Sequence, residues 1–313
     1  MGNCEFVKTD QATQELISEI TTSVFDPNKT LKDNINIIAK KYLPLLIDPA
    51  NSKLLWSAYA KCYHDGLNNL IPYAELQEDI AESVDLKPNE NKVIIDLGCG
   101  PSSFGRMQKN RAQGNHVIGL DLSETMLREG KSNFNEGGLV LCDFENNLPV
   151  KNHCADIVVS TNVLGFLNNP EKFISEIWRI LKPYGNTLLT THKQNFDLAE
   201  ILKEHYYASS NQDIDPEDTA WDTSTPKGFA ASFERAFQAS NIEVQQKIAL
   251  IAICNMALPR QSIAYAPNEQ EIKELFTKNG FSNVTIKPTY ADQYFKVSAS
   301  PNLRSDLAEI CQN

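Results

Sequence analysis

One pattern constrains the fold of this chain more than any other: from Val93 onward, short apolar runs alternate with amphipathic segments. The runs are rich in Val, Ile and Leu, and we expect five of them to be strands, at 92–97, 116–121, 138–143, 155–161 and 185–192. A segment between them places Phe173, Ile177 and Leu181 on one helical face. This alternation is typical of a parallel sheet covered by helices on both faces.

The regions around this alternation are helical in pattern. Before it, apolar residues recur at intervals of three and four, which predicts helices at 12–25, 31–47, 54–71 and 74–84. After a mostly helical stretch, the pattern predicts one more helix and two strands, at 268–280, 281–290 and 293–300. We therefore expect three parts: a helical extension or cap at 1–88, a strand-rich domain at 89–192 and 266–300, and a helical insertion at 193–265.

Composition excludes several classes of protein. The chain has 313 residues, 42% of them hydrophobic, which is enough for a substantial core. Its formal net charge of -11 argues against a nucleic-acid partner, because no basic run supplies contacts to phosphates. The seven cysteines lack metal-ligand spacing, so we expect no metal. No apolar run is long enough to span a membrane and no targeting signal is visible, so we expect a soluble, cytoplasmic protein.

A glycine turn follows the first predicted strand, in the sequence "NKVIIDLGCGPSSFG". Gly98 and Gly100 let the backbone turn sharply and approach a ligand. A dinucleotide fingerprint would have a third glycine where Ser103 stands, which weakens a nicotinamide interpretation. Asp96 would repel a pyrophosphate but attract a cationic amino group, such as that of S-adenosylmethionine.

With these residues the chain resembles the class I S-adenosylmethionine-dependent methyltransferases, in particular the small-molecule group that includes the ubiquinone and menaquinone biosynthesis enzymes. The resemblance covers roughly residues 55–192 and 267–299, through "VIIDLGCG", "VIGLDLSETML", "LCDFENNLP", "ADIVVSTNVLGFL" and "EIWRILKPYG". It implies a Rossmann-like sheet of seven strands, mostly parallel, with the last strand antiparallel. It also implies S-adenosylmethionine as the cofactor and S-adenosylhomocysteine as its product.

The resemblance assigns cofactor contacts residue by residue. These are Asp96, Gly98, Cys99 and Gly100 at the methionine moiety, Asp121 at the ribose, Leu122, Met126, Asp143 and Phe144 at the adenine, Ser160 and Thr161 in the loop lining the transfer channel, and Tyr63 on an N-terminal helix. Taken singly, Asp96 could be a strand-end cap and Asp143 a turn residue.

Two histidines are candidates for the transfer chemistry. The sulfonium of the cofactor is already activated, so a protein base is needed only where the acceptor must lose a proton. His192 ends the fifth predicted strand, where ligands bind in open α/β sheets, but it could instead bond nearby backbone. His64 lies in "YAKCYHD", where the family more often has Tyr-Asp. We expect His116, His153 and His205 to lie on the surface.

The sequence thus predicts an enzyme that transfers a methyl group to oxygen or nitrogen of a small-molecule acceptor. A transferase of another group, or a scaffold that binds the cofactor without transfer, stays open. The insertion at 193–265 is an acceptor lid or the surface of a homodimer. Its acidic residues favour a cationic acceptor or form a solvated loop; they are Asp213, Asp215, Glu217, Asp218 and Asp222.

Overall fold

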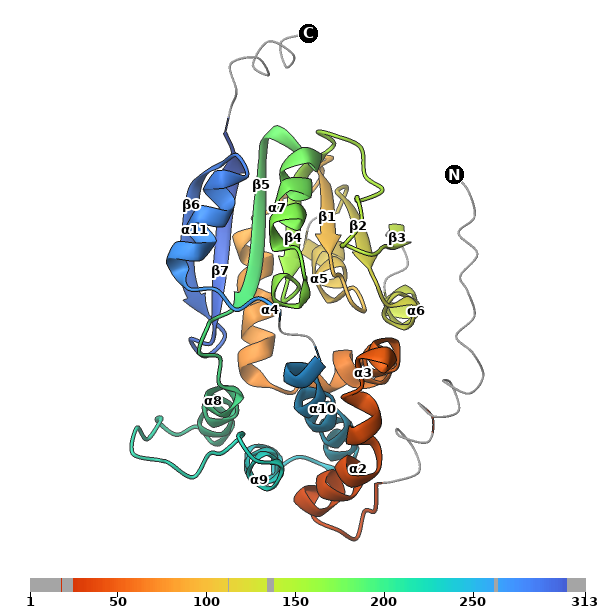
Figure 1. Cartoon of the computed structure of the whole chain (residues 1–313), viewed down its shortest axis with the longest axis vertical. Helices are drawn as coiled ribbons and strands as arrows, with labels where there is room; N and C mark the ends of the chain where they lie inside the picture. Colours follow the sequence, from red (N-terminus) through yellow and green to blue (C-terminus); the bar gives the residue numbers. More distant parts are fainter. Residues whose placement is uncertain (1–17, 19–24, 112, 134–137, 262–263, 303–313) are drawn as a thin grey trace. The chain divides into compact units, whose positions relative to one another are not determined.

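The computed structural model describes residues 18, 25–111, 113–133, 138–261 and 264–302, and these form two compact units (Figure 1). The described residues of the first, which we call the helical unit, lie within Met1–Ala74, Ser123–Glu129 and Asp197–Gln261. Those of the second, the sheet unit, lie within Glu75–Leu122, Gly130–Phe196 and Ser262–Asn313. The helix predicted at 12–25 lies almost wholly outside the described residues.

The sheet unit contains a seven-stranded sheet of order β3-β2-β1-β4-β5-β7-β6. Its strands are β1 (Val93–Leu97), β2 (His116–Asp121), β3 (Gly138–Leu141), β4 (Ala155–Thr161), β5 (Leu181–His192), β6 (Phe281–Thr289) and β7 (Tyr294–Pro301). The first five are mutually parallel, and β7 pairs antiparallel with both β5 and β6. The predicted Rossmann-like methyltransferase sheet is therefore confirmed.

Strand β5 is longer than the sequence pattern indicated. Leu181, which we expected to be the last residue of a helix, already pairs with Ala155, and the helix ends at Ile180. The pairing shifts register between Ala155 and Ile157, so the strand tolerates Pro183, which cannot donate a ladder hydrogen bond.

Helices cover both faces of this sheet, as Figure 1 shows for α5 (Ser103–Arg111), α7 (Pro170–Ile180) and α11 (Glu269–Lys278). One apolar core includes Phe173 and Ile177 of α7 and Phe276 of α11. The other includes Phe104 of α5 and residues of α4 (Ile71–Ser83), most of which belongs to this unit. The carboxyl ends of β1 to β5 consequently meet at one edge of a sheet that is held rigidly from both sides.

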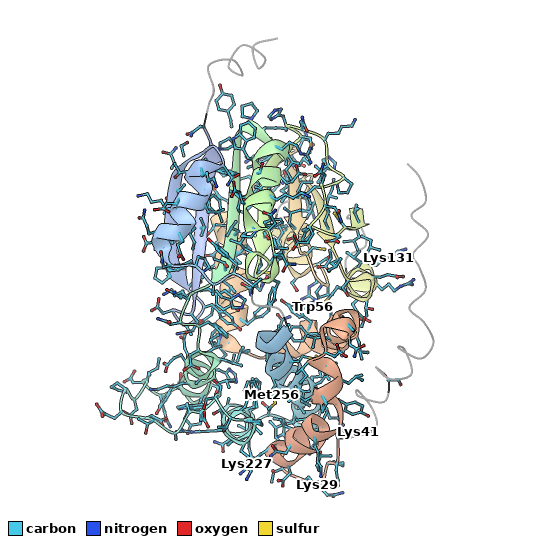
Figure 2. The ribbon with its side chains drawn as sticks, in the orientation of Figure 1. Lys29, Lys41, Trp56, Lys131, Lys227 and Met256 are labelled. Atoms are coloured by element: carbon cyan, nitrogen blue, oxygen red, sulfur yellow. The ribbon has the colours of Figure 1, made fainter. Side chains whose placement is uncertain are left out.

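The helical unit consists of helices from the two regions that flank the first five strands, together with one segment that lies between β2 and β3. They are α2 (Leu31–Leu46), η1 (Pro49–Asn51), α3 (Ser52–Leu67), α8 (Leu198–Ser210), α9 (Pro226–Phe237), α10 (Ile242–Gln261) and the first part of α6 (Glu124–Asn133). A Cβ on Gly66 would lie 2.2 Å from Ile251 Cδ1, so α3 and α10 cross closely. Figure 2 shows Met256 of α10 among these helices, with Lys41 and Lys227 pointing outward.

Two acids of the insertion, Asp218 and Asp222, make hydrogen bonds or ion pairs within this unit. The Asp218 carboxylate binds the Arg235 guanidinium at 2.8 Å and accepts hydrogen bonds from Trp221 Nε1 and Tyr207 Oη, each at 2.9 Å. The Asp222 carboxylate accepts hydrogen bonds from residues 224 and 225. These two acids are used internally, whereas the preceding acids are exposed, as in a solvated loop.

Candidate active site

The glycine turn lies directly at the carboxyl end of β1 and is tied to β2. The amides of Gly98 and Cys99 both donate to the Leu120 carbonyl, at 2.8 and 3.0 Å. Gly98 has φ +76°, and a Cβ there would lie 2.0 Å from Val163 Cγ2. A side chain at this position would therefore be both strained and obstructed, which explains the glycine.

Asp121, at the end of β2, holds the second half of this turn. Its Oδ2 accepts a hydrogen bond from the Gly100 amide at 2.8 Å. The sequence did not indicate this bond, which ties the acid expected at the ribose to the glycines expected at the methionine. Asp121 is partly exposed, so its carboxylate is both fixed in position and accessible.

Asp96 is a buried acid in β1, only 3% exposed. Burial, together with the nearby Asp121 carboxylate, raises the pKa of its carboxyl to about 7. A cation placed beside the two carboxylates would relieve both effects, because it stabilises the ionised form. A simple strand-end cap would not need a buried carboxyl with a raised pKa.

The adenine-side candidates lie at the ends of β2 and β3. Leu122 is 52% exposed and Leu141, paired opposite Asp121, is 38% exposed, so the two leucines present apolar surface at the sheet edge. Leu141 was not predicted as a site residue, although its place at the end of a strand was a usable signal. Asp143 accepts a hydrogen bond from the Glu145 amide at 3.0 Å, as a turn residue would, and Phe144 packs on Phe173 in the core.

The end of β4 is rigidly bonded to its neighbours. Ser160 Oγ donates to the Leu97 carbonyl at 2.9 Å, which ties β4 to β1, and Thr161 is the last residue of the strand. Asn162, which was not among the predicted site residues, has φ +60° and accepts a 2.6 Å hydrogen bond from Thr190 Oγ1. A left-handed non-glycine residue at this edge is the kind of strain that concentrates at functional sites.

His192 occupies an aromatic enclosure at the end of β5. Its ring lies 4.5 Å from that of Tyr294, 5.1 Å from Phe196 and 5.4 Å from Phe166. Burial lowers its pKa to about 4, so the imidazole is neutral at neutral pH. Its buried Nδ1 has no hydrogen-bond partner among the described residues, so this atom does not make the backbone bond that was the alternative to a catalytic role.

Other candidates belong to the helical unit, namely Tyr63, His64 and Met126. Tyr63 accepts a 3.1 Å hydrogen bond from Tyr73 Oη, and Met126 is buried. His64 lies on α3, but its side chain is outside the described residues.

The expectation that His205 lies on the surface is wrong. Its side chain is 5% exposed, because it is stacked on Phe237 and accepts a hydrogen bond from the Ile71 amide. The sequence pattern of this segment did not distinguish the buried face of α8 from its exposed face, so the burial of His205 was not predictable.

The arrangement fits a nucleoside cofactor that carries a cationic group. Asp96 and Asp121 supply paired acids, the glycine turn gives close approach to backbone, and the exposed leucines offer an apolar surface for a base. Ser103, at the start of α5, adds a buried hydroxyl that has no hydrogen-bond partner in the described part of the chain. Among the described residues there is no cluster of metal-ligating side chains, and no helix is long and apolar enough to cross a membrane.

Comparison with known proteins agrees with this geometry. Residues 95–189 match the family described as "Methyltransferase domain". Together with the strand order, this match identifies the sheet unit as having the fold of the class I S-adenosylmethionine-dependent methyltransferases.

Particular relatives differ in what they methylate. The chain is 25% identical over 175 residues to a malonyl-[acyl-carrier protein] O-methyltransferase of Marinomonas sp., covering 54% of this chain and 64% of that protein. It is 33% identical over 102 residues to the 18S rRNA (guanine-N(7))-methyltransferase of Schizosaccharomyces pombe, covering 32% of this chain and 37% of that protein. The chain thus spans less than two thirds of the length of either relative.

A solved structure shows the same fold at low identity. Phosphoethanolamine N-methyltransferase 2 of Haemonchus contortus, in complex with phosphomonomethylethanolamine and S-adenosylhomocysteine, has a TM-score of 0.52 and 17% identity. The match covers 82% of this chain and 60% of that one.

Proposed function

We propose that this protein transfers the methyl group of S-adenosylmethionine to an oxygen or nitrogen atom of a small-molecule acceptor. The observation that carries the proposal is the pair of acids at the glycine turn. Asp121 binds the Gly100 amide, and burial, together with the Asp121 carboxylate, raises the pKa of Asp96. The relatives include both O- and N-methyltransferases, so they leave the acceptor atom open. The net charge of -11 disfavours RNA as the acceptor.

The residues that would hold the cofactor each have a distinct task. Asp121 would bind the ribose hydroxyls, and Asp96 would face the cationic amino group across the turn formed by Gly98, Cys99 and Gly100. Leu122 and Leu141 would flank the adenine. When bound, the cofactor supplies an activated methyl group, so the main task of the protein is alignment and exclusion of water.

Further cofactor contacts are proposed from the resemblance. Asp143 and Phe144 would lie at the adenine, as would Met126. Ser160 and Thr161 would shape the transfer channel.

The candidate bases remain His192 and His64. His192 is neutral near pH 7, which is the form that accepts a proton, but its low pKa makes it a weak base. It therefore suits an acceptor whose proton is already acidic. For an amine acceptor, which needs only a neutral lone pair, no protein base is required.

Two measurements test the proposal. Calorimetric titration with S-adenosylhomocysteine should show binding to the intact chain that Asp121→Ala weakens by on the order of 100-fold, since a carboxylate with two hydroxyl partners is removed. Asp213→Ala, which removes an exposed acid of the insertion, is the matched control. Absence of binding, or equal loss in both variants, would contradict the proposal.

Transfer of labelled methyl to a metabolite extract, with the product identified by mass, separates an enzyme from a scaffold that only binds the cofactor. A transferred aminopropyl or carboxymethyl group would instead identify the alternative transferase. The homodimer and the cytoplasmic location stay predictions, as does the role of the insertion.

A further inference from the structure

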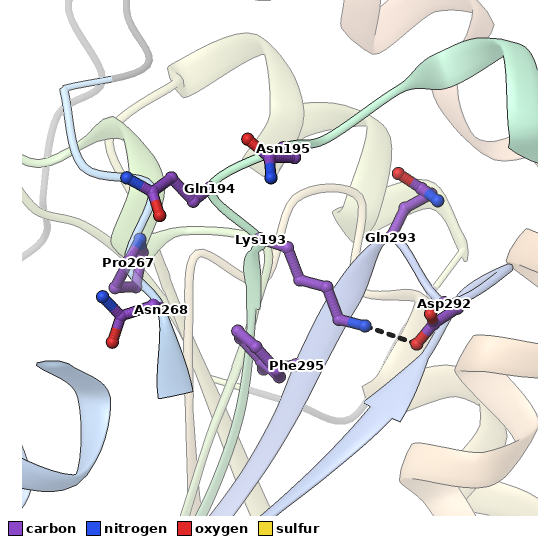
Figure 3. A pocket seen from close by; sticks show the side chains of 8 residues that line it. All are labelled: Lys193, Gln194, Asn195, Pro267, Asn268, Asp292, Gln293 and Phe295. Atoms are coloured by element: carbon purple, nitrogen blue, oxygen red, sulfur yellow. Dashed lines mark hydrogen bonds and ion pairs between the residues drawn. The ribbon is translucent and has the colours of Figure 1, made fainter. Parts of the chain in front are cut away.

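A hollow lies in the sheet unit at the carboxyl end of β5, outside the residues assigned to the cofactor (Figure 3). It has a volume of about 340 Å³ and is lined by Lys193, Gln194, Asn195, Pro267, Asn268, Asp292, Gln293 and Phe295. Lys193 is the only cationic residue among these eight, and Asp292 is the only acidic one. The remaining polar groups are neutral carboxamides.

Lys193 is positioned across this pocket rather than directed into bulk water. Its ammonium binds the Asp292 carboxylate and lies 5.1 Å from the centre of the Phe295 ring. Figure 3 shows its side chain extending over Phe295 toward Asp292. The Lys193 side chain is only 22% exposed, whereas that of Asp292 is 74% exposed. The cation is therefore fixed at the site, and its partner acid is the more replaceable of the two.

The turn that carries Asp292 has an unusual backbone. Tyr290, Ala291 and Asp292 are three consecutive non-glycine residues in the left-handed region, with φ values of 53°, 53° and 57°. The Gln293 amide donates to the Tyr290 carbonyl at 3.0 Å, and the Lys193 amide donates to the Gln293 carbonyl at 3.0 Å. Surrounding bonds thus hold the turn in a strained form that keeps Asp292 against Lys193.

We propose that this pocket binds the carboxylate or phosphate group of a small molecule. The incoming anion displaces the exposed Asp292 carboxylate from the Lys193 ammonium and receives further hydrogen bonds from carboxamides that line the pocket. Phe295 provides an apolar wall beside the bound group. Asp292 is the member of the pair that can leave, because its carboxylate is 74% exposed and returns to water when the anion takes its place.

The place of the pocket indicates which molecule carries the anion. Strands β1, β4 and β5 are parallel neighbours, so their carboxyl ends lie at the same edge, and two strand spacings amount to roughly 10 Å. The pocket therefore holds the anionic end of the methyl acceptor, with the reacting atom on the order of 10 Å away, toward the glycine turn after β1. This last step rests on the proposed function.

The binding test uses inorganic phosphate and malonate as separate probes at low ionic strength, followed by NMR of the amides of residues 193–195 and 292–293. We expect saturable binding of at least one probe, and the stronger probe tells phosphate from carboxylate. Lys193→Gln should abolish binding, whereas Asp292→Asn should tighten it several-fold, since the competing carboxylate is gone. Lys278→Gln, which breaks an exposed ion pair with Glu171, is the matched control and should bind like the wild type.

No saturable binding of either probe, or weaker binding in Asp292→Asn, would overturn the anion site. Thermal unfolding of each variant checks that it is folded, and the opposite directions expected for Lys193→Gln and Asp292→Asn cannot both come from general damage.

The acceptor step is tested by turnover of paired acceptors, one carrying a free carboxylate or phosphate and the other its neutral amide or ester. We expect the wild type to prefer the anionic member through a lower KM, and Lys193→Gln to lose that preference with kcat little changed. An equal preference in both proteins would overturn the acceptor step. Titration with S-adenosylhomocysteine is independent of the pocket, so failure of the proposed function is seen separately.

Discussion

Two largely buried acids, one in each unit, have pKa values that are shifted in opposite directions. In the sheet unit, Asp96 is 3% exposed and lies near another carboxylate, and its pKa is raised to about 7. In the helical unit, the Asp218 side chain is 9% exposed and is bonded to the Arg235 guanidinium, which holds its pKa far below the usual range. Arg235 itself lies over the rings of Tyr206 and Trp221.

This difference distinguishes an acid that stabilises the fold from an acid that is suited to bind a ligand. Asp218 has an opposite charge and several donors within the protein, so its ionised form stabilises the fold. Asp96 lacks such compensation, and its ionised form costs folding free energy unless a ligand supplies a cation. Both acids are plain Asp residues in the sequence, and only their surroundings distinguish a structural acid from one suited to a ligand.

The largest effect on stability is expected from Asp218→Ala. Removing this carboxylate leaves Arg235, Trp221 and Tyr207 without their partner, so the free energy of unfolding should fall by about 2 to 3 kcal/mol. Urea unfolding measures the change. Asp213→Ala is the control and should stay within about 0.5 kcal/mol of wild type. Equal losses in both variants would break the comparison.

Asp96→Asn should act in the opposite direction. Since the pKa is about 3.8 in the unfolded chain and about 7 in the folded one, wild type loses stability as pH rises from about 4 to 7. The amide does not titrate, so at pH 8 the variant should be more stable by about 1 to 3 kcal/mol, with little difference near pH 4. Urea unfolding at the two pH values tests this. A variant less stable than wild type at pH 8 would show that the carboxylate supports the fold.

Cofactor affinity should depend on pH for the same reason. If the cationic amino group prefers ionised Asp96, the dissociation constant for S-adenosylhomocysteine should rise about tenfold from pH 8 to pH 6, as Asp96 takes up its proton. His192 and His205, whose pKa values are near 4, do not titrate in this window. Calorimetry on Asp96→Asn should give weaker binding with a flat profile. A dissociation constant of the wild type that does not change with pH would show that Asp96 does not interact with the amino group of the cofactor.

Much of the sheet unit could be predicted because its signals are local. The apolar strand runs and the glycine turn are both visible in short stretches of sequence. The contacts of Asp121 with Gly100, the aromatic enclosure of His192 and the pair of Lys193 with Asp292 were not predictable. Apart from the contact of His192 with Phe196, they join residues that are 21 or more positions apart, and single-sequence patterns carry no information on such pairings.

The same comparison extends, with smaller effects, to two buried histidines. His205 accepts a hydrogen bond from the Ile71 amide at 3.2 Å, whereas Nδ1 of His192 has no partner among the described residues. At pH 8, His205→Phe should therefore cost about 1 kcal/mol, because a buried amide loses its acceptor, and His192→Phe should change stability by less than about 0.5 kcal/mol.

Both pKa values are lowered to about 4, so each histidine makes wild type lose stability as pH falls from 6.5 toward 4, and each variant should gain relative to wild type at pH 5. Urea unfolding at pH 8 and pH 5 measures both effects. A greater loss for His192→Phe than for His205→Phe at pH 8 would mean that the imidazole at the sheet edge serves the fold, and it would remove His192 from the candidate bases.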